Sequence, residues 1–124
     1  MKKNSTNTVN KGKEGEEIAV KHLKDNGFCV LHTNWRHKKK EIDIIAEKNG
    51  YLVVVEVKTR HGDFELPCEA VTKAKQRFII EAANAYVEKY CVNKEVRFDI
   101  IAIQHNANSY TIEHIEDAFY PLMK

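Results

Sequence analysis

The fold of this chain can be worked out from the stretch EIDIIAEKNGYLVVVEVKTR, residues 41–60. Two apolar runs flank Asn49-Gly50 in it. Asn-Gly is the strongest short signal for a two-residue type I′ hairpin, because both turn positions need a positive φ. A turn at this point places Lys48 opposite Tyr51 and fixes the register of the two strands from there outward. The stretch therefore predicts an antiparallel hairpin with one defined pairing.

That register brings four charged side chains to one end of the hairpin. Asp43 faces Glu56 and Glu41 faces Lys58, and residues that face each other share a face of the sheet. Facing carboxylates raise the pKa of one acid unless a cation joins them. Mg²⁺ binds one or two carboxylates together with water and substrate phosphate, and a bound metal lowers the pKa of its water. Lys58 could orient that water or stabilise transition-state charge. The hairpin alone predicts a divalent-metal site or, as the alternative, an exposed Glu41–Lys58 salt bridge.

The remaining sequence alternates between helical and strand patterns. We expect a flexible arm over residues 1–11 and a single domain over 12–124. The order αβββαββ predicts an α/β fold, with a mixed central sheet of about five strands and flanking helices. Outside the hairpin, the expected elements are a helix over 12–26, a strand over 28–35, a helix over 71–90, and strands over 96–104 and 111–115.

Composition limits the class of protein. With 43% hydrophobic and 31% charged residues, the 124-residue chain is typical of one globular domain. It has no apolar run long enough to span a bilayer, and its start lacks the apolar stretch of a secretory signal. Cys29, Cys68 and Cys91 are odd in number and far apart, which argues against a disulfide framework or a structural zinc site. We therefore expect a cytoplasmic protein without a membrane partner.

Six motifs occur in order over most of residues 12–120. Asp43, followed after twelve residues by Glu56-Val57-Lys58, is similar to the PD-(D/E)xK signature of restriction-endonuclease-like nucleases. The full set resembles the YraN-like family of uncharacterised bacterial proteins, which are related to archaeal-type Holliday junction resolvases. The motifs are G-x-x-G-E at 12–16, NWR at 34–36, EIDII at 41–45, VVVEVKTR at 53–60, EAV-x3-KQR at 69–77 and RFDII at 97–101.

This resemblance implies a restriction-endonuclease-like three-layer fold and a metal-dependent DNA endonuclease that uses Mg²⁺ or Mn²⁺ in repair or recombination. It implies that Asp43 and Glu56 hold the metal and that Lys58 serves the attacking water. A first-helix Glu approaches the metal in resolvase-like nucleases, which assigns this role to Glu16; a favourable place near the helix dipole is the alternative. Lys40 stands where the family usually has Gly.

That departure at Lys40 favours a second hypothesis, a nucleic-acid-binding module that cuts nothing. A third is a scaffold whose acids form only salt bridges. Gln76 is expected either at the site, touching it or a phosphate, or on a solvated face. We expect Asp99 to have a structural role, paired with Arg97 or a neighbouring strand, and Trp35 to be packed. A homodimer is left open.

Basic residues form three groups that the predicted hairpin gathers around the acids. A phosphate backbone suits such a surface. A solvated, lysine-rich sheet edge that prevents aggregation is the alternative. The candidates for nucleic-acid binding are Arg36, Lys38, Lys39, Lys40, Arg60, Lys73, Lys75 and Arg77.

Overall fold

The second strand of the predicted hairpin is the centre of a five-stranded sheet with the order β1-β2-β3-β4-β5. The computed structural model describes residues 8–61 and 71–119. β3 and β4 run parallel and all other neighbours are antiparallel, so the sheet is mixed. The strands are β1 (Cys29–His37), β2 (Lys40–Lys48), β3 (Tyr51–His61), β4 (Glu95–His105) and β5 (Tyr110–Phe119).

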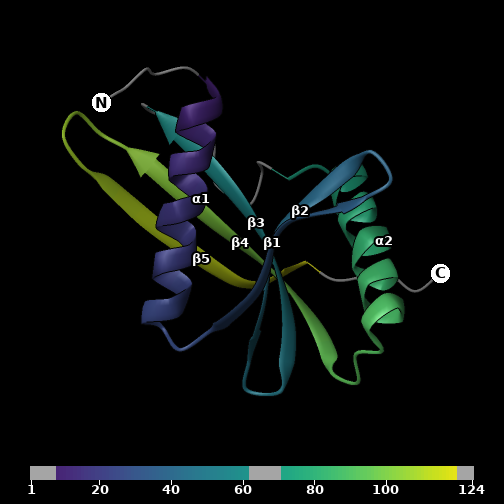
Figure 1. Cartoon of the computed structure of the whole chain (residues 1–124). Helices are drawn as coiled ribbons and strands as arrows, with labels where there is room; N and C mark the ends of the chain where they lie inside the picture. Colours follow the sequence, from purple (N-terminus) through teal and green to yellow (C-terminus); the bar gives the residue numbers. More distant parts are fainter. Residues whose placement is uncertain (1–7, 62–70, 120–124) are drawn as a thin grey trace.

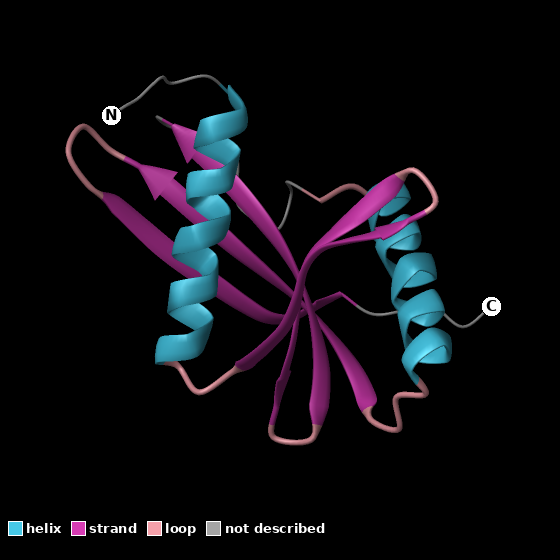
Figure 2. Cartoon of the chain, viewed as in Figure 1, coloured by secondary structure: helices cyan, strands magenta, loops and turns pink. Residues whose placement is uncertain are grey.

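One helix packs on each face of this sheet. α1 (Thr8–Asp25) covers one face and α2 (Lys73–Tyr90) covers the other, which gives three layers (Figures 1 and 2). Helix α2 forms the crossover between the parallel strands β3 and β4. The expected three-layer α/β fold with the order αβββαββ is confirmed. Neither described helix is long and apolar enough to cross a membrane.

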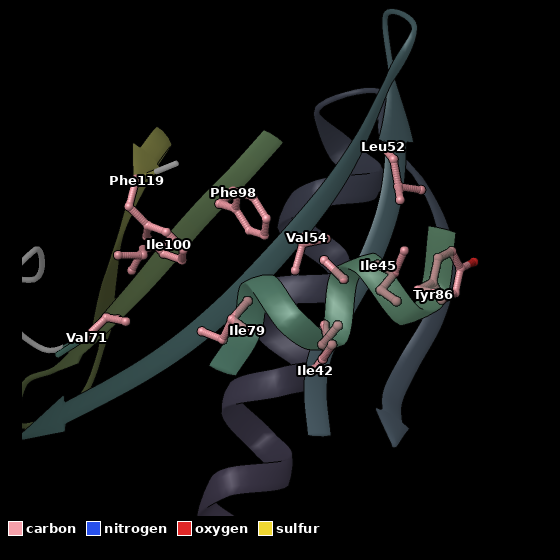
Figure 3. Close-up of a cluster of buried hydrophobic side chains, with 12 residues drawn as sticks. Ile42, Ile45, Leu52, Val54, Val71, Ile79, Tyr86, Phe98, Ile100 and Phe119 are labelled. Atoms are coloured by element: carbon pink, nitrogen blue, oxygen red, sulfur yellow. The ribbon is translucent and has the colours of Figure 1, made fainter. Parts of the chain in front are cut away.

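Alternation along β3 divides the core into two clusters. Val53 and Val55 are buried under α1, in the cluster that contains Ala19 and Leu23 of that helix. Leu52 and Val54 face α2, where a second cluster spans the sheet from Ile42 to Phe119 (Figure 3). Burying apolar side chains on both faces stabilises the central strand strongly, at about 25 cal/mol for each Å² removed from water. A charged residue in this strand therefore needs a specific partner.

Several element boundaries differ from the sequence expectation. The first helix already begins at Thr8, so residues 8–11 belong to it and only 1–7 of the expected arm lie outside the described residues. The second helix begins at Lys73, because the Thr72 side chain accepts a hydrogen bond from the Lys75 N–H and caps the helix there. The strands β1, β4 and β5 are longer than expected. Residues 62–70, which include Cys68, lie outside the described residues.

The predicted hairpin register is confirmed over its turn-proximal half. Asn49 and Gly50 both have positive φ, 52° and 84°, and Lys48 pairs with Tyr51. The pairing continues without a shift to Ile44 and Val55 and ends there. Beyond this point the two strands diverge, with β2 running toward α2 and β3 toward the start of α1 (Figure 1). The facing pairs predicted farther from the turn are thus not part of the ladder.

Candidate functional site

The site begins at an irregularity in β2. Ile42 and Ile45 both pack in the cluster under α2, although residues three apart in a regular strand face opposite sides. In the neighbouring strand, the register places Asn34 beside Asp43, and Asn34 has a left-handed backbone with φ of 52°. Asn tolerates this conformation better than most residues. The alternation of β2 therefore breaks around Asp43.

Asp43 bridges the gap that opens between the strands. Its Oδ2 accepts a hydrogen bond from the Val57 backbone N–H at 2.8 Å. A backbone carbonyl of β2 would accept such a bond in a continuing ladder. The carboxylate thus takes the place of a main-chain acceptor and holds Asp43 against β3, next to Glu56.

Glu56 is a buried charge in the central strand, with only 4% of its surface exposed. The Lys75 ammonium, from the first turn of α2, lies 2.9 Å from Glu56 Oε2. The other oxygen, Oε1, is buried and has no hydrogen-bond partner among the residues that the structure describes. An unsatisfied buried polar atom costs about 1–3 kcal/mol, so a native protein rarely carries one without a reason.

The charges around Asp43 and Glu56 favour an additional cation between them. The pKa of the Asp43 carboxyl is raised to about 7, first by burial and then by the negative charge of Glu56. The Val57 N–H and the Lys75 ammonium act in the opposite direction, whereas Glu16 adds to the rise. Burial lowers the pKa of Lys75, but its hydrogen bond and charge interaction with Glu56 outweigh burial and raise it. The pair of acids therefore holds more negative charge than Lys75 alone offsets.

The first helix approaches the site closely. A Cβ on Gly15 would lie 2.5 Å from Thr59 Oγ1 of β3, so only glycine permits this spacing. The next residue, Glu16, accepts a hydrogen bond from the Asn34 side-chain amide and acts electrostatically on Asp43. Glu16 therefore lies close enough to Asp43 to act on its charge, and Asn34 orients the Glu16 side chain.

The other three catalytic candidates occupy different positions. Lys58 follows Glu56 by two residues in β3, is half-buried, and makes no ion pair with any residue that the structure describes. Glu41 is exposed and bonds Arg36 of β1 at 2.7 Å rather than facing Lys58, because the ladder ends at Ile44. Gln76 donates its side-chain amide to the Val71 carbonyl, which ties it to the start of α2.

Several of the predicted phosphate-binding residues already have partners within the chain. Lys39, Lys73 and Arg77 are exposed and make no ion pair with the described residues. The φ of Lys40 is not positive, so the backbone at this position does not require the glycine that the family usually has. The partnered residues are Arg36 with Glu41, Lys38 with Glu81 at 3.0 Å, Lys40 over the Phe78 ring at 3.8 Å, Arg60 with the Thr59 carbonyl, and Lys75 with Glu56.

Sequence reasoning missed two residues of the site. Lys75, a candidate for nucleic-acid binding, forms an ion pair with Glu56 that the sequence did not predict. A helical side chain leans toward the N-terminus of its helix, and the Thr72 cap starts α2 just before Lys75, so this orientation was open to prediction. Asn34 was noted only within the NWR motif. Its left-handed backbone depends on pairing across strands, which local sequence does not display.

A second buried acid has a structural role, as expected. Asp99 is fully buried and accepts two hydrogen bonds from Arg97, one from the Asp117 N–H and one shared with His114. Burial alone would raise the pKa of Asp99, but the bonds from His114 and Arg97 outweigh it and hold the pKa below its ordinary value. Trp35, also as expected, packs against the α2 cluster beside Tyr86.

The donor set fits a hard divalent cation. Among the described residues no group of three or more His, Cys, Asp or Glu side chains has the geometry of a metal site. Mg²⁺, however, needs only one or two carboxylates from a protein and completes its shell with water and substrate phosphate. Asp43 and the unpartnered Oε1 of Glu56 would supply these ligands.

Comparison with known proteins supports the family inferred from the motifs. Residues 15–103 match the model of the Uncharacterised protein family UPF0102. A UPF0102 protein of Phocaeicola vulgatus is 50% identical over 111 residues, which cover 89% of this chain and 92% of that protein. Relatives from Bacteroides fragilis and Flavobacterium psychrophilum are 46% and 47% identical, covering 89% and 88% of this chain and 92% of each relative. The chain therefore belongs to family UPF0102, the YraN family.

Proposed function

We propose that this protein is a metal-dependent endonuclease that hydrolyses phosphodiester bonds in DNA, with Mg²⁺ or Mn²⁺ held by Asp43 and Glu56. The observation that carries the proposal is the buried Oε1 of Glu56, which has no partner in the described part of the chain and lies beside an acid whose pKa is raised to about 7. A hard cation would neutralise a buried carboxylate oxygen that lies near a second acid without enough positive charge. The similarity of the Asp43, Glu56 and Lys58 spacing to nucleases with the PD-(D/E)xK signature supports the same activity.

Each residue has a distinct part in this reaction. A bound divalent metal activates water and stabilises charge on the phosphoryl group. Asp43 is held in place by the Val57 N–H, which keeps its carboxylate at the point where the strands part. Lys58 is free of ion pairs with the described residues and follows Glu56 on the same strand, so it can orient the attacking water or stabilise the developing negative charge.

The surroundings suit a DNA partner. Glu16 is oriented by Asn34 and adjusts the charge at Asp43 without being buried itself. Three exposed basic side chains make no ion pair with described residues: Lys39, Lys73 and Arg77. Such cations provide the salt-dependent, sequence-independent part of DNA affinity. The family relation to junction resolvases suggested by the motifs makes structure-selective cutting in repair or recombination the preferred setting.

A second candidate is a nucleic-acid-binding module that has lost cleavage. The Lys75 ion pair favours it, because an ammonium already neutralises one of the two acids without any metal. A protein of this kind would bind DNA through the same basic residues and show no Mn²⁺-dependent cleavage.

A cleavage panel separates the two functions. Duplex, single-stranded, flap and four-way-junction DNA are incubated with the protein and with Mg²⁺ or Mn²⁺. We expect cleavage of at least one substrate and its loss in Asp43→Ala and in Glu56→Ala. The matched control is Glu47→Ala, which removes an acid of β2 that pairs with Lys94 near the turn. Cleavage by Asp43→Ala at the wild-type rate would refute the assigned site, and no cleavage of any substrate would favour the binding module.

A further inference from the structure

Lys75 occupies a fixed place over the acid pair. Its backbone N–H donates to Thr72 Oγ1 at 3.2 Å, so the capped start of α2 sets the position from which the side chain extends. Its ammonium then lies 2.9 Å from Glu56 Oε2. Among the described residues no other cation forms an ion pair with Glu56.

The two partners differ in exposure. The Glu56 side chain is 5% exposed, whereas the Lys75 side chain is 40% exposed. A buried carboxylate depends on its counterion, because an isolated charge in the interior is costly. A lysine ammonium on a flexible four-carbon stem is strongly hydrated and can move into water. The acid cannot leave the pair, but the lysine can.

A divalent ion at this site would lie close to that ammonium. It would take Oε1 of the carboxylate whose Oε2 binds Lys75, so two positive centres would share one Glu56 side chain. Positive charges a few ångströms apart repel each other even at the effective dielectric of a protein surface.

We propose that Lys75 is the resident counterion of Glu56, and that a divalent cation at Asp43 and Glu56 binds in competition with it. This inference rests on the proposed metal site and adds a residue that regulates its occupancy. Lys75 keeps the acids together while no metal is present, and it weakens the site's affinity for metal. It is a positioning residue, because it acts through Glu56.

The test is a calorimetric titration of Mn²⁺ into the full-length protein and three variants. Lys75→Gln removes the charge, Lys75→Arg keeps it, and Lys73→Gln removes an exposed charge from the same helix turn. We expect Lys75→Gln to bind Mn²⁺ about ten-fold more tightly than wild type or more. Lys75→Arg and Lys73→Gln should bind as wild type does. Loss of a merely structural contact would weaken metal binding rather than strengthen it.

Thermal unfolding without metal accompanies the titration. Lys75→Gln should have a lower Tm, because Glu56 loses its counterion, and Mn²⁺ should raise that Tm by more than it raises the wild-type value. If Lys75→Gln does not fold, Lys75→Met, which keeps the apolar stem, takes its place in both measurements.

The outcomes distinguish this inference from the function on which it rests. If wild type binds Mn²⁺ and the uncharged variants bind no more tightly, the competition is refuted and the metal site stands. If neither wild type nor the uncharged variants bind Mn²⁺, the proposed metal site and the competition both fall. Binding by Lys75→Gln alone would support the competition in its strongest form.

Discussion

Asp43 Oδ2 accepts a hydrogen bond from the Val57 backbone N–H at 2.8 Å, at the position where β2 and β3 separate. The Asp99 carboxylate does the same for the Asp117 N–H at 3.0 Å, where the ladder between β4 and β5 is interrupted. In both places a buried or half-buried acid replaces a main-chain acceptor. The fold tolerates these two interruptions because the backbone N–H groups of Val57 and Asp117 keep hydrogen-bond acceptors.

The charge of Asp43 makes stability depend on pH. Its pKa is 3.8 in an unfolded chain and about 7 in the folded protein without metal, so folding favours the protonated acid. This contribution to the free energy of unfolding is present below pH 3.8 and is lost as the pH rises to about 7. Asp43→Asn should remove the dependence and should be more stable than wild type at pH 8 by up to about 4 kcal/mol, the equivalent of this pKa rise.

Urea unfolding at pH 5 and pH 8 measures this difference, with Glu47→Gln as the control on the same strand. Wild type and Asp43→Asn are compared at each pH, so the contribution of histidine titration to stability cancels between them. Glu56→Gln should give no such gain, because it leaves Lys75 without its partner. An equal gain for both acids would mean that Lys75 is not coupled to Glu56.

Replacing Lys58 should have a different effect from replacing Asp43 or Glu56. Lys58→Ala should lose cleavage while it still binds Mn²⁺, because the lysine acts on water or on transition-state charge rather than on the metal. Its DNA affinity should fall little, since one contact among several is lost. Single-turnover cleavage and Mn²⁺ titration measure the two properties, and Lys89→Ala near the end of α2 is the control. Loss of Mn²⁺ binding in Lys58→Ala would show that the role assigned to it is wrong.

DNA affinity should fall steeply with salt if the basic residues neutralise phosphates. Each neutralised phosphate contributes a slope of about −0.9 to the plot of log affinity against log salt. Replacing Lys39, Lys73 and Arg77 together by Ala should flatten the slope measured by fluorescence anisotropy. A control that replaces Lys24, Lys89 and Lys94 removes the same charge from the ends of α1 and α2 and the turn into β4. Equal slopes for both triple variants would place the DNA elsewhere.

Extending that replacement to Lys38 and Lys40 tests the loop between β1 and β2. Lys38 bonds Glu81 and Lys40 lies over Phe78, so both are engaged with α2. We expect them to add less to the slope than Lys39 does. A larger contribution from this pair would mean that DNA displaces them from the helix.

Asp99 should be essential for stability. Asp99→Ala removes the partner of the Arg97 guanidinium, which is 15% exposed, and it leaves the Asp117 N–H without an acceptor. Breaking a buried pair on one side costs about 3–5 kcal/mol. Urea unfolding measures the loss, and Asp25→Ala, an exposed acid at the end of α1, is the control. A loss below about 1 kcal/mol would mean that the network contributes little.

Gly15 should resist a change that normally stabilises a helix. Gly to Ala within a helix is favourable by about 1 kcal/mol. Here the added Cβ would lie 2.5 Å from Thr59 Oγ1, so Gly15→Ala should destabilise the protein. In a Thr59→Ser background, where the side chain can rotate away more freely, the loss should be smaller. A double-mutant cycle in urea measures the coupling, and independent effects would show that the helix and strand are not in close contact there.

The hairpin and the register near its turn follow from local sequence alone. Asn49-Gly50 needs positive φ at both positions, and this local requirement sets the pairing from Lys48 and Tyr51 to Ile44 and Val55. Alternation then assigns each residue of β3 to a face. Buried Glu56 could be found in this way, because an acid inside an apolar strand breaks the pattern that hydrophobic burial imposes.

Long-range packing sets where the pairing of β2 and β3 stops and which side chains meet there. Lys75 reaches Glu56 because α2 packs across that face of the sheet, and Asn34 reaches Glu16 because α1 packs on the other. Glu41 leaves the predicted pairing for Arg36, since β2 follows β1 beyond Ile44. Local sequence sets turns and alternation, which span a few residues. The divergence of two strands depends on helices that press on opposite faces of the sheet, and those contacts join residues far apart in the chain.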